Sequence, residues 1–364
     1  MPYALEVLVA VSAGLMRWTM GCFGGASFVV RAVLRMGSLV RWLHSRWAAR
    51  QLVRSKATVS HGEAEWLTYA HAPVDESTTL LWLPGGAFIS HDAYELGVAR
   101  LLLPRLAEHV AGEAANTARD ETASTARTAS RGVPRILVYR YPLPARRAAS
   151  ADGTQPASVD AVAACLVQLC AGHRVVLMGD SAGGCIATAL FLSRHLAFAA
   201  ARAADRPTLL GLCLVCPWLD LTHGSASHQR NARRDALHRS LVEHGAAHFL
   251  RGSAGGEAAG EAFLLASLRA ASPAHAPPPA LAALPPAGCL IVRGALDILH
   301  DDGAVLQRNA AQAGAPADAV QLVTVGGVWG IHCGCLLPMA EAYSTAVRSA
   351  HALMVNHVAT LLRS

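Results

Sequence analysis

Short, continuous apolar runs alternate along the chain with longer stretches in which apolar residues recur at helical spacing. Continuous runs of about four to eight apolar residues are typical of strands that are buried on both faces of a sheet. The predicted strands are residues 65–70, 78–83, 136–139, 175–178, 209–215, 289–292 and 320–325.

Predicted helices, in which apolar residues recur at helical spacing, lie between or after several of these strands. They are residues 98–109, 159–170, 181–195 and 339–362. Pro104 has no backbone N–H, so we expect it to kink the first of these helices or to divide it. Strands and helices that alternate in this way predict an α/β fold, in which helices cover both faces of a mostly parallel sheet.

Two stretches interrupt the alternation. Residues 111–132 are almost wholly Ala, Thr, Ser, Arg, Glu and Asp, and this composition predicts a disordered surface insertion. Residues from about 222 to 283 are first rich in His and Arg, then in Gly and Ala, and finally in Pro. We expect the second stretch to form a helical insertion over the top of the sheet.

The N-terminal segment, residues 1–57, differs from the main domain expected at residues 58–364. Residues 7–30 are apolar apart from Arg17, and about 20 apolar residues suffice to span a bilayer. An Arg near the middle of such a span costs about 2.5–3.5 kcal/mol of insertion free energy. The basic flank that follows, with interleaved tryptophans, is typical of a cytoplasmic membrane surface.

Three interpretations of this segment stay open: a membrane anchor or interfacial helix, a lid helix packed on the main domain, or an organelle transit peptide. The first predicts an association with a membrane surface, with the endoplasmic reticulum as the candidate compartment. The alternative location is the cytoplasm.

The charge of +6 arises mostly in the N-terminal segment, because no acidic residue occurs between Glu6 and Glu63. We therefore do not predict a nucleic-acid partner. The nine cysteines are an odd number, and several fall inside predicted strands or helices, which is typical of buried thiols in a reducing compartment. Cys213-x-x-Cys216 and Cys333-x-Cys335 are close pairs, but no second pair stands at zinc-binding spacing, so we expect neither a metal nor a cofactor.

The strand at residues 175–178 runs into Gly179-Asp-Ser-Ala-Gly183 and then into a helix. This is the strand, turn and helix context of a nucleophile elbow, in which Ser181 occupies a strained turn. Glycines at positions 179 and 183 avoid collisions with the neighbouring elements. The helix behind Ser181 offers N–H groups and a partial positive charge to an oxyanion. The alternative interpretation is a structural glycine-rich turn.

A serine nucleophile needs a histidine base, and that base needs an acid that orients it. Among the histidines after Ser181, His332 comes just after a predicted strand and follows a suitable acid, Asp297, which also comes just after a strand. Asp220 is the second candidate for the acid. The alternative is that Asp297 and His332 are unrelated residues of surface loops.

Further motifs appear in a fixed order around these residues. They are Pro84-Gly-Gly-Ala-Phe88, Tyr139-Arg140, Cys216-Pro-Trp-Leu-Asp-Leu221, Leu284-Pro-Pro286 and Gly294-x-x-Asp297-x-Leu299-x-Asp301. Together with the elbow and His332, this set resembles the hormone-sensitive-lipase-like family of α/β-hydrolases over about residues 64–340. Some eukaryotic relatives, such as arylacetamide deacetylase and steryl-acetate hydrolases, carry an N-terminal membrane anchor.

The resemblance implies an α/β-hydrolase fold with a helical lid, and a serine carboxylesterase that cleaves an apolar ester through Ser181, Asp297 and His332. It also implies that the N–H groups of Gly86, Ala87 and Ala182 form the oxyanion hole. Pro84 and Ala87 depart from the family's His-Gly-Gly-Gly motif, and Ala87 fits the motif if its φ is negative. The alternative function is a non-catalytic small-molecule binder on the same fold, but such proteins usually lack a triad member.

Overall fold

The structure is a computed structural model that describes residues 51–91, 94–120, 132–143, 157–251, 261–337 and 340–364. The predictions for residues 1–50 therefore lie outside the described residues. Within the described ranges, no helix combines the length and the apolar composition that crossing a bilayer requires.

An eight-stranded sheet forms the centre of the molecule, with the strand order β1-β2-β4-β3-β5-β6-β7-β8. The pairs β1–β2 and β2–β4 are antiparallel and the other pairs are parallel, which confirms the predicted mostly parallel sheet. The strands are β1 (Leu52–Ala57), β2 (Glu63–Tyr69), β3 (Val74–Leu83), β4 (Val133–Arg140), β5 (Arg174–Asp180), β6 (Thr208–Val215), β7 (Cys289–Gly294) and β8 (Val320–Val325).

Strand β1 was not predicted, and its position corrects the domain boundary. It pairs with β2 at the edge of the sheet, and most of its side chains are exposed. Edge strands of this kind carry charged residues rather than an apolar run, so the hydrophobic pattern does not reveal them. The main domain therefore begins before residue 58.

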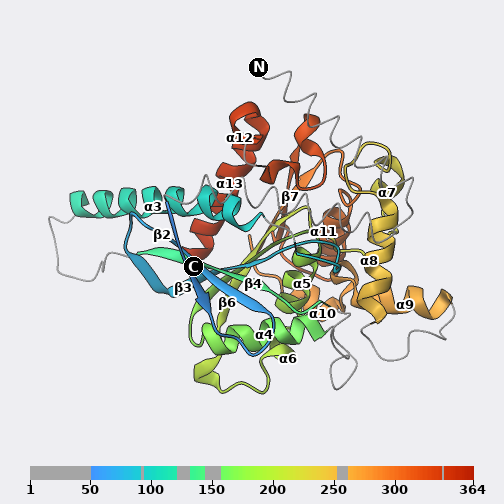
Figure 1. Cartoon of the computed structure of the whole chain (residues 1–364), viewed down its shortest axis with the longest axis horizontal. Helices are drawn as coiled ribbons and strands as arrows, with labels where there is room; N and C mark the ends of the chain where they lie inside the picture. The colour runs from blue at the N-terminus through green and yellow to red at the C-terminus, as the bar shows by residue number, and fades with distance from the viewer. Residues whose placement is uncertain (1–50, 92–93, 121–131, 144–156, 252–260, 338–339) are drawn as a thin grey trace.

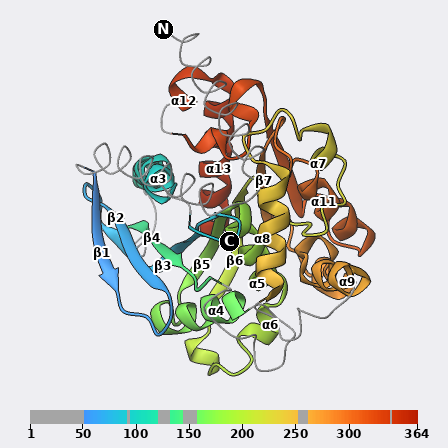
Figure 2. The ribbon, with the colours of Figure 1, turned by 45° about the vertical axis from the view of Figure 1, so that its right-hand side comes forward.

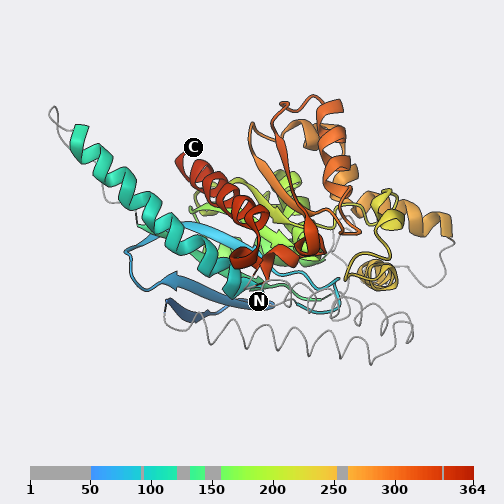
Figure 3. The same cartoon turned by 90° about the horizontal axis from the view of Figure 1, so that it is seen from above.

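Helices cover both faces of the sheet, as predicted (Figures 2 and 3). The buried side chains of α3 (Glu95–Asp120) and α13 (Thr345–Arg363) join one hydrophobic cluster. Those of α4 (Ala157–Leu169), α5 (Ser181–Leu192) and α11 (Asp302–Gln312) join the other. Successive residues of the central strands alternate between the two clusters, which is the period expected of a strand that is buried on both faces.

Helix α3 is longer than its predicted range and Pro104 does not divide it. Its last part covers residues 111–120, where we expected disorder. The alanines of this stretch have the highest intrinsic helix propensity, which explains why a sequence without large apolar residues continues the helix. The rest of the predicted disordered insertion, residues 121–131, lies outside the described residues. The closing helix is in turn divided into α12 (Ala340–Tyr343) and α13.

The described residues of the predicted insertion, 222–251 and 261–283, form several short helices. These helices are α7 (Ser227–Arg230), α8 (Arg239–Arg251), α9 (Glu261–Ala271) and α10 (Pro278–Ala282). Helices α7, α8 and α9 gather on one side of the molecule, opposite the free end of α3 (Figure 1). We refer to residues 222–283 as the lid insertion.

We expect Gly183→Ala to destabilise the fold, because an added Cβ would lie 2.0 Å from the carbonyl oxygen of Leu83 on β3. Relief of such a backbone clash typically costs about 1–3 kcal/mol of unfolding free energy, measurable by urea denaturation. The matched control is Gly112→Ala, because Gly112 lies on α3 with no atom near the added Cβ. Equal stability of the two variants would contradict this packing.

Candidate active site

Ser181 lies where β5 ends and α5 begins, and its φ of 49° places its backbone in the left-handed region. A serine rarely adopts this conformation, which is maintained by the surrounding packing. Gly179 and Gly183 both lie so close to the backbone of Leu83 that neither position has room for a side chain. The elbow is thus a tight turn between β5 and α5 that packs against the end of β3, as the motif predicts.

Asp297 and His332, which come from the loops after β7 and β8, lie in direct contact. The Nδ1 atom of His332 is 3.1 Å from Oδ1 of Asp297, and the Asp297 side chain is completely buried. Because a carboxylate accepts, the proton of a neutral imidazole lies on Nδ1, which leaves Nε2 as an acceptor. The two residues that the sequence paired are therefore brought together.

Asp180, the residue before Ser181, joins three loops of the site. Its Oδ1 accepts a hydrogen bond of 3.0 Å from the N–H of Gly85, and its Oδ2 lies 3.8 Å from Sγ of Cys333. The turn after β3 and the loop that carries His332 therefore meet at the elbow. We did not predict this role, although a buried Asp beside the nucleophile could have suggested it.

Asp220, the second candidate for the acid, has other partners. Its Oδ1 accepts from the N–H and the hydroxyl of Thr222, and lies 3.3 Å from Nε2 of His275. The structure therefore pairs His332 with Asp297 rather than with Asp220.

The Gly86–Ala87 turn differs from the expectation. The φ angles of Gly86, Ala87 and Phe88 are 112°, 54° and 60°, so the condition under which Ala87 would fit the family's motif, a negative φ, is not met. The physical reason is local hydrogen bonding, since the carbonyl of Gly86 accepts from the N–H groups of both Ile89 and Ser90 and closes a tight turn. Ala182 is the second residue of α5, where N–H groups have no acceptor within the helix.

Helix α8 of the lid insertion packs directly on this turn. A Cβ at Gly245 would lie 2.4 Å from the carbonyl oxygen of Ala87. The ring of Phe88 stacks on that of Phe249 with centroids 4.2 Å apart, and lies 5.4 Å from the ring of Trp218. These contacts hold Ala87 and Phe88 in a conformation that neither residue favours.

Pro84 stands where the family's motif has a histidine, and a different contact partly replaces the support of that side chain. The carbonyl oxygen of Pro84 accepts a hydrogen bond of 3.0 Å from the hydroxyl of Tyr141. With the bond from Gly85 to Asp180, this contact fixes the start of the turn without a histidine side chain.

The ionisation of the Asp297–His332 pair is coupled. Burial raises the pKa of Asp297, but the charge of His332 and the hydrogen bond between the two residues lower it by more. Burial lowers the pKa of His332, but the Asp297 carboxylate and its hydrogen bond raise it by more. The carboxylate thus stabilises the imidazolium, which is the charge that a general base acquires.

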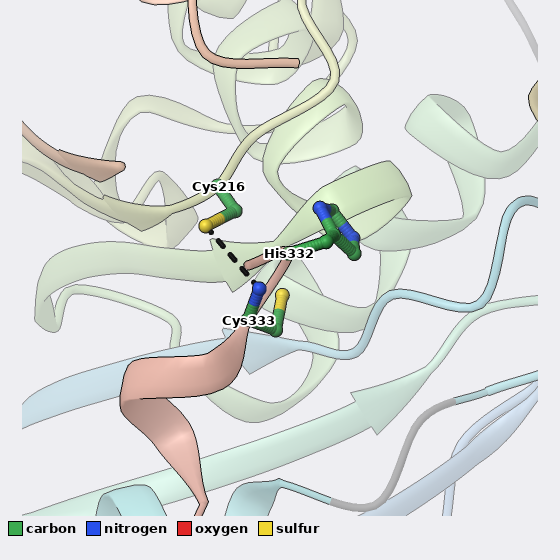
Figure 4. A group of neighbouring side chains, drawn as sticks. All are labelled: Cys216, His332 and Cys333. Atoms are coloured by element: carbon green, nitrogen blue, oxygen red, sulfur yellow. Dashed lines mark hydrogen bonds between the residues drawn. The ribbon is translucent and has the colours of Figure 1, made fainter. Parts of the chain in front are cut away.

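Two thiols lie beside this pair. Ligand atoms of Cys216, His332 and Cys333 lie within 4.8 Å of one another, a spacing that a thiophilic cation could bridge. Both thiols are already engaged, however: Sγ of Cys216 accepts from the N–H of Cys333 at 3.3 Å, as Figure 4 shows, and Sγ of Cys333 contacts Oδ2 of Asp180. We therefore assign these thiols to the hydrogen bonding of the loops.

Comparisons with known proteins identify the family of the fold. Residues 140–329 match a family model described as the alpha/beta hydrolase fold. The chain belongs to the α/β-hydrolase family. It is also 31% identical over 280 residues to an acetyl-hydrolase of Streptomyces hygroscopicus, a match that covers 75% of this chain and 74% of the relative.

Solved structures of α/β-hydrolases share the fold. A hormone-sensitive lipase from a metagenome library has a TM-score of 0.61 and 19% identity, and the match covers 98% of both chains. An esterase of the bacterial hormone-sensitive lipase family has a TM-score of 0.59 and 20% identity, over 92% of this chain and 99% of the esterase. The predicted resemblance is confirmed, and the family places this chain among esterase- and lipase-like hydrolases.

We expect Phe249→Ala to destabilise the hydrolase, because it removes the ring that stacks on Phe88 and leaves a cavity beside the strained turn. Truncation of a buried Phe costs about 3–5 kcal/mol of unfolding free energy, and urea denaturation measures it. The control is Leu265→Ala on α9, where the side chain is 53% exposed and a change within about 0.5 kcal/mol is expected. A Phe249→Ala variant as stable as the control would show that α8 does not support the turn.

Proposed function

We propose that this hydrolase is a serine carboxylesterase that cleaves an apolar ester through an acyl-enzyme. The observation that carries the proposal is the Asp297–His332 hydrogen bond, together with the contact of the His332 loop, through Cys333, with Asp180 beside Ser181. The chain order serine, acid, histidine is that of α/β-hydrolases.

In the first step the Ser181 oxygen attacks the carbonyl carbon of the ester and transfers its proton to Nε2 of His332. Asp297 holds the ring by Nδ1 and stabilises the imidazolium. The N–H groups of Gly86, Ala87 and Ala182 are the proposed donors to the oxyanion, and one such donor is typically worth about 10²–10³ in rate.

The tetrahedral intermediate then breaks the bond between the carbonyl carbon and the alcohol oxygen, and His332 returns its proton to the alcohol. Water attacks the acyl-enzyme with His332 again as the base, which releases the carboxylic acid and restores the Ser181 hydroxyl. The sequence of steps needs no cofactor.

The proposed substrate is a small, apolar ester. The aromatic side chains of Phe88, Trp218 and Phe249 lie beside the proposed oxyanion turn and support an apolar group there. The name of the relative, acetyl-hydrolase, favours a short acyl group.

The direct test is Ser181→Ala with p-nitrophenyl acetate as the substrate. We expect kcat to fall on the order of 10⁶-fold, because the variant has no nucleophile. Undiminished hydrolysis by the variant would refute the role of Ser181. A wild-type chain that binds the ester without releasing p-nitrophenol would favour the non-catalytic binder.

The choice of acid is tested by a pair of matched variants. Asp297→Asn removes the charge that stabilises the His332 imidazolium, so kcat is expected to fall on the order of 10⁴-fold. Asp220→Asn makes the same chemical change at a buried carboxylate that faces Thr222 and His275, and should leave a far larger share of the activity. The reverse order of the two losses would make Asp220 the acid.

A further inference from the structure

One segment of the lid insertion, residues 225–235, runs along the loop that carries Asp297. We call this segment the strap. Three of its side chains, Ser227, Asn231 and Asp235, stand four residues apart and are at most 1% exposed. All three bind main-chain groups of the loop at residues 295–301.

The first two side chains fix the loop on both sides of the acid. The Ser227 hydroxyl donates to the carbonyl of Ile298 at 2.7 Å and accepts from the N–H of Asp301 at 3.1 Å. The Asn231 amide donates to the carbonyl of Ala295 at 3.2 Å and to the carbonyl of Asp297 itself at 2.8 Å. The backbone of the proposed acid is therefore held by the strap.

Asp235 goes further, because its carboxylate binds both catalytic loops at once. Its Oδ2 accepts from the N–H of Ile298 at 2.8 Å, and its Oδ1 accepts from the N–H of His332 at 2.7 Å. Carboxylate oxygens of Asp235 and Asp297 and a ring nitrogen of His332 all lie within 4.8 Å of one another. A second carboxylate thus stands beside the imidazole.

This placement has an electrostatic cost. Burial, and after it the charge of Asp297, raise the pKa of the Asp235 carboxyl to about 7, so the charged carboxylate is the main form above that pH. An asparagine has one acceptor oxygen where a carboxylate has two, so an amide at this position could bind only one of the two loops in the same way. The carboxylate is best explained by what it does for both loops and for the charge on His332.

Resting on the function proposed above, we propose that Asp235 is a positioning residue of the ester hydrolysis. It sets the separation of the Asp297 and His332 loops, and its negative charge supports the imidazolium that forms when Ser181 gives up its proton. The lid insertion is then part of the catalytic geometry as well as a cover.

The groups that face the His332 ring are the Asp297 and Asp235 carboxylates and the Cys216 thiol from the loop after β6. The neighbouring Cys333 thiol faces Asp180. Anions beside an imidazole favour its charged form, so the net pKa of His332 is raised above its ordinary value of 6.5. The neutral base is therefore lost as the pH falls, and the acidic limb of kcat/KM lies above pH 6.5.

The test is Asp235→Asn in the full chain with p-nitrophenyl acetate over a range of pH. We expect kcat to fall on the order of 10²-fold from the displaced loops, with little change in KM. Because one anion beside His332 is gone, the acidic limb of the profile should also move to lower pH. Asp318→Asn, which makes the same change at an exposed aspartate before β8, is the control and should match the wild type.

A second variant, Asp235→Glu, keeps the charge but moves it, so kcat should fall while the acidic limb stays near that of the wild type. This variant also provides the test if Asp235→Asn fails to fold. An Asp235→Asn enzyme with the kcat and pH profile of the control, or an Asp235→Glu enzyme whose limb shifts to lower pH, would overturn the proposal. A wild type without any hydrolysis would instead overturn the proposed function itself.

Discussion

The close contact between Gly183 and the backbone of Leu83 sets the conformation on which the site depends. It leaves Ser181 in the left-handed region, a strain of order 1–3 kcal/mol, and points the start of α5 at the edge where the strands end. Other non-glycine residues with a positive φ stand in neighbouring loops of this edge: Ala87, Phe88, Cys216 and Cys333.

Strain of this kind persists only where the surrounding contacts outweigh it. Here those contacts come from buried polar groups that each serve more than one loop. Asp180 joins the elbow to the turn after β3 and to the loop of His332, and Asp235 joins the loops of the proposed acid and base. Aromatic stacking by Phe249 adds a contact from α8.

The sequence allows the fold and the pairing of Asp297 with His332 to be predicted because both depend on local pattern. Buried strands appear as apolar runs, and Asp297 and His332 follow such runs directly. Strand β1 was not predicted, because an exposed edge strand has no such run. The expected boundary at residue 58 and the expected disorder at residues 111–120 are wrong for related reasons, since neither element depends on large apolar residues.

What could not be predicted depends on contacts between distant segments. The positive φ of Ala87 follows from a turn closed by its own hydrogen bonds and covered by α8. The partners of Asp235 are decided by the path of the lid insertion, whose sequence is rich in His and Arg and gives no apolar period. Ser227, Asn231 and Asp235 stand four residues apart, but this spacing indicates a shared role only once the contacts of the strap are known.

Covalent labelling measures directly whether the strained serine is the nucleophile. The intact wild-type chain would be treated with a fluorophosphonate, which reacts with activated serines, and the modified peptide would be identified by mass spectrometry. A single adduct on Ser181, formed far more slowly in Asp297→Asn, is the result that this geometry predicts. The absence of an adduct, or an adduct on another serine, would contradict it.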